Sequence, residues 1–176
     1  VSLHPLHPST YEGETYIEQS ARLIKTFEIL DEIKARHEKV LIFLESREMQ
    51  PLLSALIKKR YKLDKEPLLI NGAVSGKERQ KRVNEFQELE EGFNAMILSP
   101  KAGGVGLTLT AANNVIHLQR WWNPAVEDQC TDRVFRIGQT KDVNVYIPQS
   151  LYGSNPDVSF DVKINSLLEN KRSLSR

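Results

Sequence analysis

Short apolar runs, separated by segments with helical periodicity, are the feature that most constrains this fold. In the helical segments apolar residues recur at three- and four-residue intervals, as in Ile24, Phe27 and Leu30. Strands that are apolar throughout and alternate with helices are typical of a parallel sheet covered on both faces. The sequence therefore predicts a three-layer α/β fold. The predicted strands are 39–45, 67–71, 93–99, 114–119 and 143–148.

The predicted helices fill the intervals between these strands. Ser20 is a suitable N-cap for the first helix, and Pro51 marks the start of the second or a kink in it. In parallel sheets, ligands gather beyond the carboxyl ends of the strands. The loops after Asn71, Ser99 and Gln119 should therefore form the site. The remaining predicted helices are 47–61, 76–90, 123–135 and 162–173.

Composition excludes several classes of protein. A net charge of +1 over 176 residues gives no global affinity for polyanions, so a nucleic-acid surface must be a local patch. The single cysteine, Cys130, excludes an internal disulfide, suits a reducing compartment and is expected to be a small buried residue. The four histidines have no metal-ligand spacing, and no apolar run approaches membrane-spanning length. The chain begins without Met, and we expect it to be a fragment.

The run GAVSGKE, residues 72–78, is similar to a phosphate-binding loop. Its spacing is too short, and Glu78 stands where a Ser or Thr would reach magnesium, so a turn followed by a helix start is favoured. The basic residues of KERQKR lie at the start of that helix, where they could contact a backbone phosphate. A solvated helix face is an equally good interpretation.

The loop SPKAGGVGLTLT, residues 99–110, has three glycines within four positions. A plain turn needs one glycine, and each further one costs conformational entropy. Close approach of the backbone to a nucleotide or a phosphate explains the others better.

The run EDQCTDRVFRIGQ contains two arginines, Arg133 and Arg136, one turn apart. If a helix starts at Pro124, then Gln129 lies on the same face as both arginines, at i, i+4 and i+7. Such a pair could neutralise a transferring phosphoryl group as arginine fingers. From spacing alone, an ordinary salt-bridged helix is the safer interpretation.

Taken in order, these stretches resemble the C-terminal RecA-like lobe of the Swi/Snf family of helicase-like ATPases in helicase superfamily two. The resemblance rests on VLIF, GAVSGKERQKRVNEFQ and the run from ILSPKAGGVGLTLT through RWWNPAVEDQCTDRVFRIGQT to VNVY. It implies a linker at 1–19, the helicase C-terminal lobe at 20–148, and a flexible insert with a closing helix at 149–176. This lobe would be the second of a two-lobed motor.

The resemblance also implies an activity. Family members are ATP-driven translocases on double-stranded DNA that remodel protein–DNA complexes, in the nucleoid or the nucleus. ATP and Mg²⁺ would be bound mainly by a first RecA-like lobe absent from this sequence, so the 176 residues alone should not hydrolyse ATP. The implied roles are fingers for Arg133 and Arg136, ATP-cleft support for Gln129, Gly104 and Gly106, and DNA-backbone contacts for Gly72, Lys77, Arg79, Ser99, Lys101 and Thr108.

Three features depart from the family pattern, and one of them is FLES, residues 43–46, which replaces a more polar ending of the first strand. Gln119 replaces the usual Asp, which puts one charge contact in doubt, and Cys130 replaces a small Ala. Two alternatives are a degenerate lobe that only binds DNA or protein, and an RNA-helicase lobe. The Gln129, Arg133 and Arg136 set argues against the first, and the W-N-P and R-I-G-Q runs argue against the second.

Overall fold

The core of the protein is an all-parallel sheet of five strands in the order β2-β3-β1-β4-β5. The structure is a computed structural model that describes residues 14–18, 20–103, 106–119, 124–134, 138–149, 167 and 169. The strands are β1 (Lys39–Phe43), β2 (Leu68–Ile70), β3 (Asn94–Leu98), β4 (Asn114–His117) and β5 (Asn144–Tyr146). The helices are α1 (Glu14–Glu18), α2 (Ala21–Ala35), α3 (Met49–Tyr61), α4 (Gly76–Gln87), α5 (Pro100–Gly103) and α6 (Pro124–Thr131). The expected three-layer α/β fold is confirmed.

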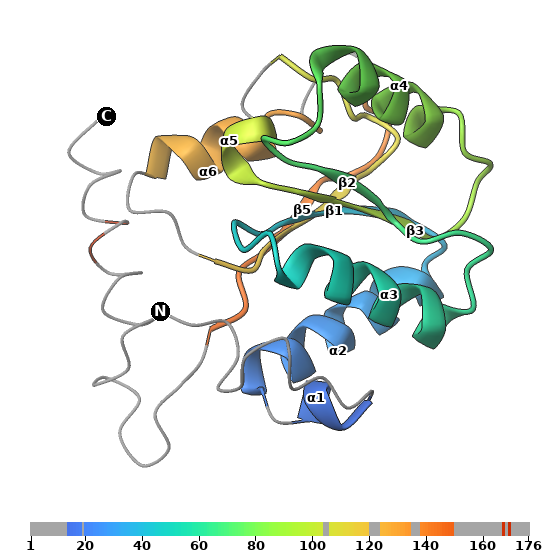
Figure 1. The fold of residues 1–176 in the computed structure, drawn as a ribbon, viewed down its shortest axis with the longest axis vertical. Helices are drawn as coiled ribbons and strands as arrows, with labels where there is room; N and C mark the ends of the chain where they lie inside the picture. Colours follow the sequence, from blue (N-terminus) through green and yellow to red (C-terminus); the bar gives the residue numbers. More distant parts are fainter. Residues whose placement is uncertain are drawn as a thin grey trace.

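Helices cover both faces of this sheet (Figure 1). Helices α1, α2 and α3 lie on one face, and α4, α5 and α6 lie on the other. Each strand alternates its side chains between the faces, so Val40 and Ile42 join one apolar cluster while Leu41 and Phe43 join the other. Burial on both faces explains why the strands are apolar throughout.

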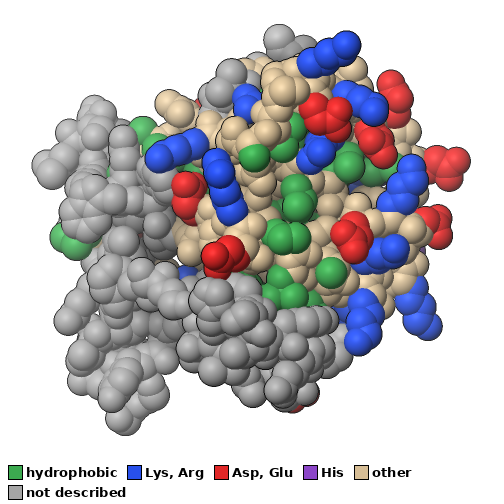
Figure 2. Space-filling view, in the orientation of Figure 1, with side chains coloured by type: hydrophobic (Ala, Val, Ile, Leu, Met, Phe, Trp, Pro, Cys, Tyr) green, Lys and Arg blue, Asp and Glu red, His purple; other side chains and the backbone are tan. Residues whose placement is uncertain are grey.

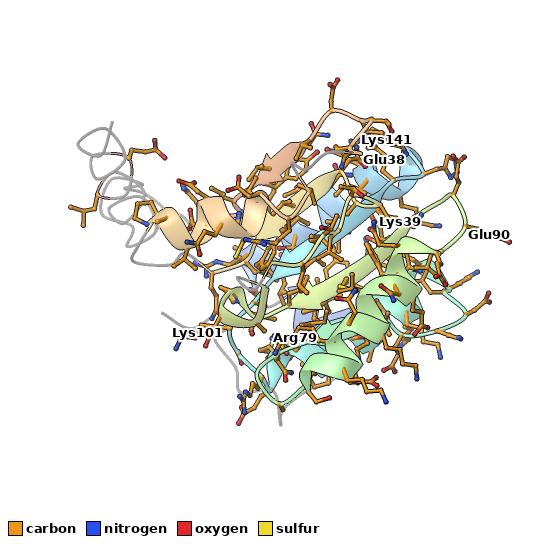
Figure 3. All side chains as sticks on the ribbon, turned by 90° about the horizontal axis from the view of Figure 1, so that it is seen from above. Glu38, Lys39, Arg79, Glu90, Lys101 and Lys141 are labelled. Carbon is orange, nitrogen blue, oxygen red and sulfur yellow. The ribbon has the colours of Figure 1, made fainter. Side chains whose placement is uncertain are left out.

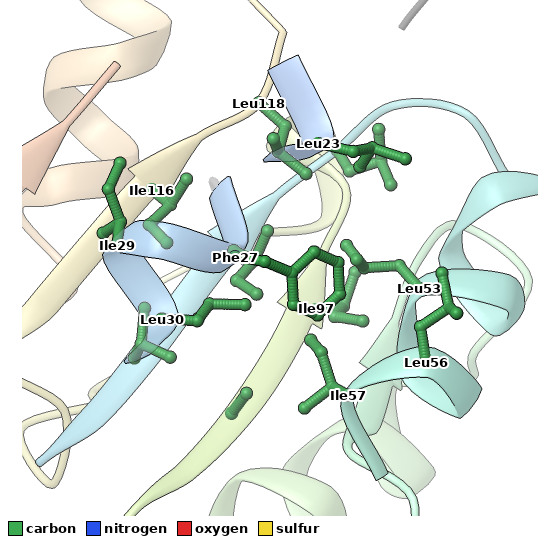
Figure 4. Close-up of a cluster of buried hydrophobic side chains, with 14 of the residues drawn as sticks. Leu23, Phe27, Ile29, Leu30, Leu53, Leu56, Ile57, Ile97, Ile116 and Leu118 are labelled. Carbon is green, nitrogen blue, oxygen red and sulfur yellow. The ribbon is translucent and has the colours of Figure 1, made fainter. Parts of the chain in front are cut away.

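The larger cluster lies between the sheet and helices α2 and α3 (Figure 4). Phe27 and Leu30 of α2 meet Leu53 and Ile57 of α3 over Ile97 of β3. These side chains are at most 2% exposed, so truncating any of them to Ala would cost about 2–5 kcal/mol.

Local capping chemistry sets the helix starts. Ser20 Oγ accepts from the backbone N–H of Leu23, and Ser75 Oγ accepts from that of Glu78, as N-caps do. The predicted N-cap role of Ser20 is confirmed. Pro51 lies in the first turn of α3, where its missing N–H costs no helical bond, so it marks the helix start.

Two segments expected to lack regular structure are helical. The expected linker 1–19 contains α1, whose Tyr16 and Ile17 are buried in the larger cluster. The expected loop after β3 begins with α5, a single turn of helix. Neither helix is long enough to show a periodic pattern in the sequence. Of the segment 149–176, only residues 149, 167 and 169 are described.

No helix among the described residues combines the length and apolar composition needed to cross a membrane.

Candidate functional site

The carboxyl ends of four strands align at one edge of the sheet. Phe43 of β1 is in register with Leu98 of β3 and His117 of β4, and Leu98 is in register with Ile70 of β2. The chain continues this alignment past Leu98, because the N–H of Ser99 donates to the carbonyl of Ile70 (2.8 Å). The loops after β2 and β3 therefore begin at the same carboxyl edge, as the sequence predicted, and the loop after β1 joins them there. The loop after Gln119 is also predicted at this edge, but residues 120–123 lie outside the described residues.

The loop after β2 presents the first group of predicted residues. Asn71 Oδ1 accepts from the N–H of Ala73, which turns the chain toward α4, and Gly72 is exposed in this turn. A Cβ on Gly72 would lie 3.0 Å from Nη2 of Arg47, an exposed residue in the loop after β1. Sequence reasoning missed Arg47 because only the fold brings the two loops together.

The start of α4 agrees with the interpretation of GAVSGKE as a turn followed by a helix start. Ser75 caps the helix by accepting from the backbone N–H of Glu78. The side chain of Glu78 pairs with Arg82 (3.0 Å). Arg82 also donates to the carbonyl of Leu69 (2.6 Å), so it serves the fold. Lys77 is exposed, whereas Arg79 is half-buried and donates to the carbonyl of Val74.

The loop after β3 holds the second group. Ser99 is only 6% exposed and its Oγ accepts from the N–H of Ala102, so it starts α5 and is poorly placed to contact a ligand itself. Lys101 and Thr108 are exposed. Lys101 lies toward the same end of the molecule as Arg79, and Lys39 and Lys141 lie toward the other (Figure 3).

Gly106 has φ of +54°, a left-handed conformation that favours glycine, and nothing lies within 4 Å of its missing Cβ. The backbone conformation therefore favours a glycine here, with no crowding of a Cβ among the described residues. Gly104 lies outside the described residues.

Helix α6 begins at Pro124, as predicted, but ends earlier than predicted. It stops at Thr131, and the N–H groups of Arg133 and Val134 donate three residues back, to Cys130 and Thr131. Such tightening is common in the last turn of a helix. Arg133 therefore lies past the end of α6, and Arg136 lies outside the described residues, so the predicted face shared by Gln129, Arg133 and Arg136 stays a prediction.

Arg133 nevertheless stays linked to Gln129. Its Nε donates to the carbonyl of Gln129 (2.9 Å), which fixes the direction of the guanidinium. Arg133 is 7% exposed, whereas the side chain of Gln129 is exposed. Cys130 is 1% exposed beside it, and burial raises the pKa of its thiol to about 12.

Two of the departures from the family pattern have clear local roles. Cys130 packs in the second apolar cluster with its Sγ 3.8 Å from the carbonyl oxygen of Pro100, so the expectation of a small buried residue is confirmed. Gln119 accepts a hydrogen bond from the N–H of Glu45. An amide oxygen accepts this bond without the negative charge that a carboxylate would bring.

Backbone bonds join the loop after β3 to the end of α6. The N–H of Leu109 donates to the carbonyl of Arg133 (3.0 Å), and α5 packs against α6. Two stretches that the sequence marked separately, 99–110 and 127–139, thus form one unit. Within the described residues, no three His, Cys, Asp or Glu side chains could together hold a metal ion.

Together, the parallel sheet and the loops at its carboxyl edge define a RecA-like lobe. Residues 21–138 match the model of the helicase conserved C-terminal domain, and the chain belongs to this family. Within it, the chain is the C-terminal RecA-like lobe of a Swi/Snf-type ATPase, as the sequence resemblance implied.

Relatives and solved structures agree with this assignment. The chain is 41% identical to the putative ATP-dependent helicase/translocase YwqA of Bacillus subtilis over 96% of its length, and spans 18% of that protein. The structure of the C-terminal part of the Fun30 ATPase domain matches 91% of this chain and 48% of that one, with a TM-score of 0.75 and 30% identity. The Sulfolobus solfataricus SWI2/SNF2 ATPase core in complex with dsDNA matches 98% of this chain and 34% of that one, with a TM-score of 0.73 and 35% identity.

Proposed function

We propose that this chain is the second lobe of an ATP-dependent motor that translocates on double-stranded DNA and remodels protein–DNA complexes. The lobe would supply arginine fingers to ATP held by a first lobe, and contacts to the DNA backbone. The observation that carries the proposal is the hydrogen bond between Leu109 and Arg133, because it holds the loop assigned to DNA directly against a residue assigned to ATP.

The residues at the carboxyl edge fit phosphate better than a cation. Arginine presents several N–H donors and a permanent positive charge, which match phosphate oxygens. Arg133 and Arg136 would neutralise charge on the transferring phosphoryl group, with Gln129, Gly104 and Gly106 shaping that side of the cleft. The described residues offer no cluster for Mg²⁺, which we assign to the first lobe with most of the ATP.

The DNA contacts are proposed along the loops after β2 and β3. Gly72, Lys77, Arg79, Lys101 and Thr108 would touch backbone phosphates, and Ser99 would act mainly by starting the helix that presents Lys101. Arg47 joins this set because it lies against Gly72. Phosphate contacts carry no sequence information, which suits a motor that must move over any sequence.

Charge on the surface agrees with a local DNA contact. On the face drawn in Figure 2, lysines and arginines are interspersed with aspartates and glutamates instead of forming one large basic field. A contact of this kind would be limited to a few phosphates.

Substitution of Arg136 in the full-length protein tests the proposal. Arg136→Ala should reduce DNA-stimulated ATP turnover by about 10³-fold, since arginine fingers contribute that much or more, while duplex-DNA affinity stays nearly unchanged. The exposed Lys59→Ala, on α3 at the other face of the sheet, is the control and should leave turnover intact. Loss of DNA binding with turnover preserved in Arg136→Ala would refute the finger assignment.

Nucleic-acid preference and the need for the first lobe are tested separately. Duplex DNA should stimulate the turnover of the full-length protein more than RNA does, and the reverse would favour an RNA helicase. The isolated 176 residues should show no DNA-stimulated turnover, and measurable turnover would refute the assignment of ATP to the first lobe.

A further inference from the structure

The turn at residues 109–112 connects the DNA-facing and ATP-facing parts of the lobe through two glutamine side chains. The turn is closed by the N–H of Ala112, which donates to the carbonyl of Leu109 (3.2 Å). Leu109 is fully buried in the same apolar cluster as Phe86 of α4 and Val134. The turn therefore lies between α4 and the end of α6.

Gln87, the last residue of α4, holds the turn from one side. Its Nε2 donates to Thr110 Oγ1 (3.1 Å), and its Oε1 accepts from the N–H of Ala111 (2.8 Å). Both ends of the amide are thus engaged by consecutive residues of the turn. Gln87 is half-buried, so water competes less for these bonds than it would at an open surface.

Gln139 holds the turn from the other side. Its Nε2 lies within hydrogen-bond distance of three carbonyl oxygens, those of Ala112 (2.8 Å), Thr110 (3.2 Å) and Val134 (3.2 Å). Its Oε1 accepts from the N–H of Lys141 (3.1 Å), which fixes the orientation of the amide. One side chain thereby joins the turn to the segment that follows Arg133.

We infer that Gln87 and Gln139 are positioning residues that pass movement of α4 on DNA to Arg133, which follows α6. This inference rests on the proposed function, because it assigns a coupling role between the DNA and ATP contacts proposed above. The path runs from α4 through Gln87 to the turn 109–112, and from there through Gln139 and the Leu109–Arg133 bond. Neither glutamine needs to touch DNA or ATP.

The test is the DNA stimulation factor of the full-length protein, defined as ATP turnover with saturating duplex DNA divided by turnover without it. The enzyme concentration cancels in this ratio when both rates are measured at a temperature where each variant is fully folded without DNA, because bound DNA would otherwise raise the folded fraction. Gln87→Ala should lower the factor about 10-fold, in the usual range for coupling between sites, while the Kd for DNA changes less than about twofold.

Gln80→Ala is the matched control on the same helix. Gln80 is exposed and donates to Asn84 of its own helix, so its loss should leave the stimulation factor unchanged. An equal loss in Gln80→Ala, or no loss in Gln87→Ala, would overturn the inference.

Two replacements of Gln139 give a sharper comparison. Gln139→Met removes the donor but adds no charge, whereas Gln139→Glu turns a carboxylate toward three carbonyl oxygens. Gln139→Glu should therefore lower the stimulation factor more than Gln139→Met does, and the reverse order would contradict the positioning role of the Gln139 donor.

Wild-type behaviour distinguishes this inference from the proposed function. If DNA fails to stimulate the wild-type protein, the proposed function is wrong. If DNA stimulates the wild type and the Gln87 and Gln139 variants equally, only the coupling role is wrong.

Discussion

The side chain of Gln119 accepts a hydrogen bond from the backbone N–H of Glu45 at 3.0 Å and so ties the end of β4 to the end of β1. Gln119→Leu would leave the partly buried N–H of Glu45 without this partner. We expect the free energy of unfolding to fall by about 1–2 kcal/mol, as measured by urea denaturation. Gln119→Glu keeps an acceptor but adds a charge beside the Glu45 carboxylate, and an effect larger than that of Gln119→Leu would show that charge repulsion dominates.

Stability should depend on pH through Glu38. Partial burial would raise the pKa of this carboxyl, but hydrogen bonds from Arg36 and Asn113 outweigh burial and lower the pKa below its ordinary value of 4.5. A lowered folded-state pKa gives stability that is present above the unfolded pKa and lost as the pH falls through the folded pKa. The free energy of unfolding of the wild type should therefore exceed that of Glu38→Gln near neutral pH, and the difference should shrink as the pH falls below about 4.5.

A constant difference between wild type and Glu38→Gln at every pH would contradict this assignment. Asp64→Asn is a suitable control, since Asp64 is exposed and the sheet does not depend on it.

Cys130 should be chemically inert in the folded protein. Burial raises the pKa of its thiol to about 12, so almost no thiolate exists at pH 8. A thiol reagent such as iodoacetamide should label Cys130 only after denaturation, and rapid labelling of native protein would mean that α6 opens readily. Cys130→Ala should cost about 1 kcal/mol, because it removes one small buried group.

The salt dependence of DNA affinity should show whether Lys77 contacts a phosphate. Each phosphate contact contributes about one to the slope of log affinity against log salt, so Lys77→Ala in the full-length protein should reduce that slope by about 1. The weakening should be equal for unrelated duplex sequences. Lys59→Ala, on the opposite face of the sheet, should leave the slope unchanged.

The fold was predictable because a strand that is buried on both faces is apolar at every position, and this pattern is visible in the sequence. The all-apolar run VLIF could only be a central strand once helical segments surrounded it. Tyr16 and Ile17 left no such mark, because two apolar residues make no period, and their helix is defined by the cluster it packs into.

The site was only partly predictable. The loops after β2 and β3 were identified because strand ends in a parallel sheet share an edge. The end of α6 was missed because tertiary bonds, from Leu109 and Gln139, satisfy carbonyls that a longer helix would otherwise use. Arg47, Gln87 and Gln139 act through contacts distant in sequence, and no local pattern indicates such contacts.

The opposite edge of the sheet has a separate role. There Asn114 donates to the carbonyl of Lys39 (3.1 Å), and Lys39 donates to the carbonyl of Glu90 (2.8 Å), so amides and backbone bind the strand starts together. The loop before β2 lies at this same edge, and its exposed residues are Asp64, Lys65 and Glu66. Lys65 pairs with Glu85 of α4 (3.8 Å) and faces the same hollow as Lys77, so a fluorophore or surface tether is better attached at Asp64, before β2 and away from the strand ends that carry the proposed contacts.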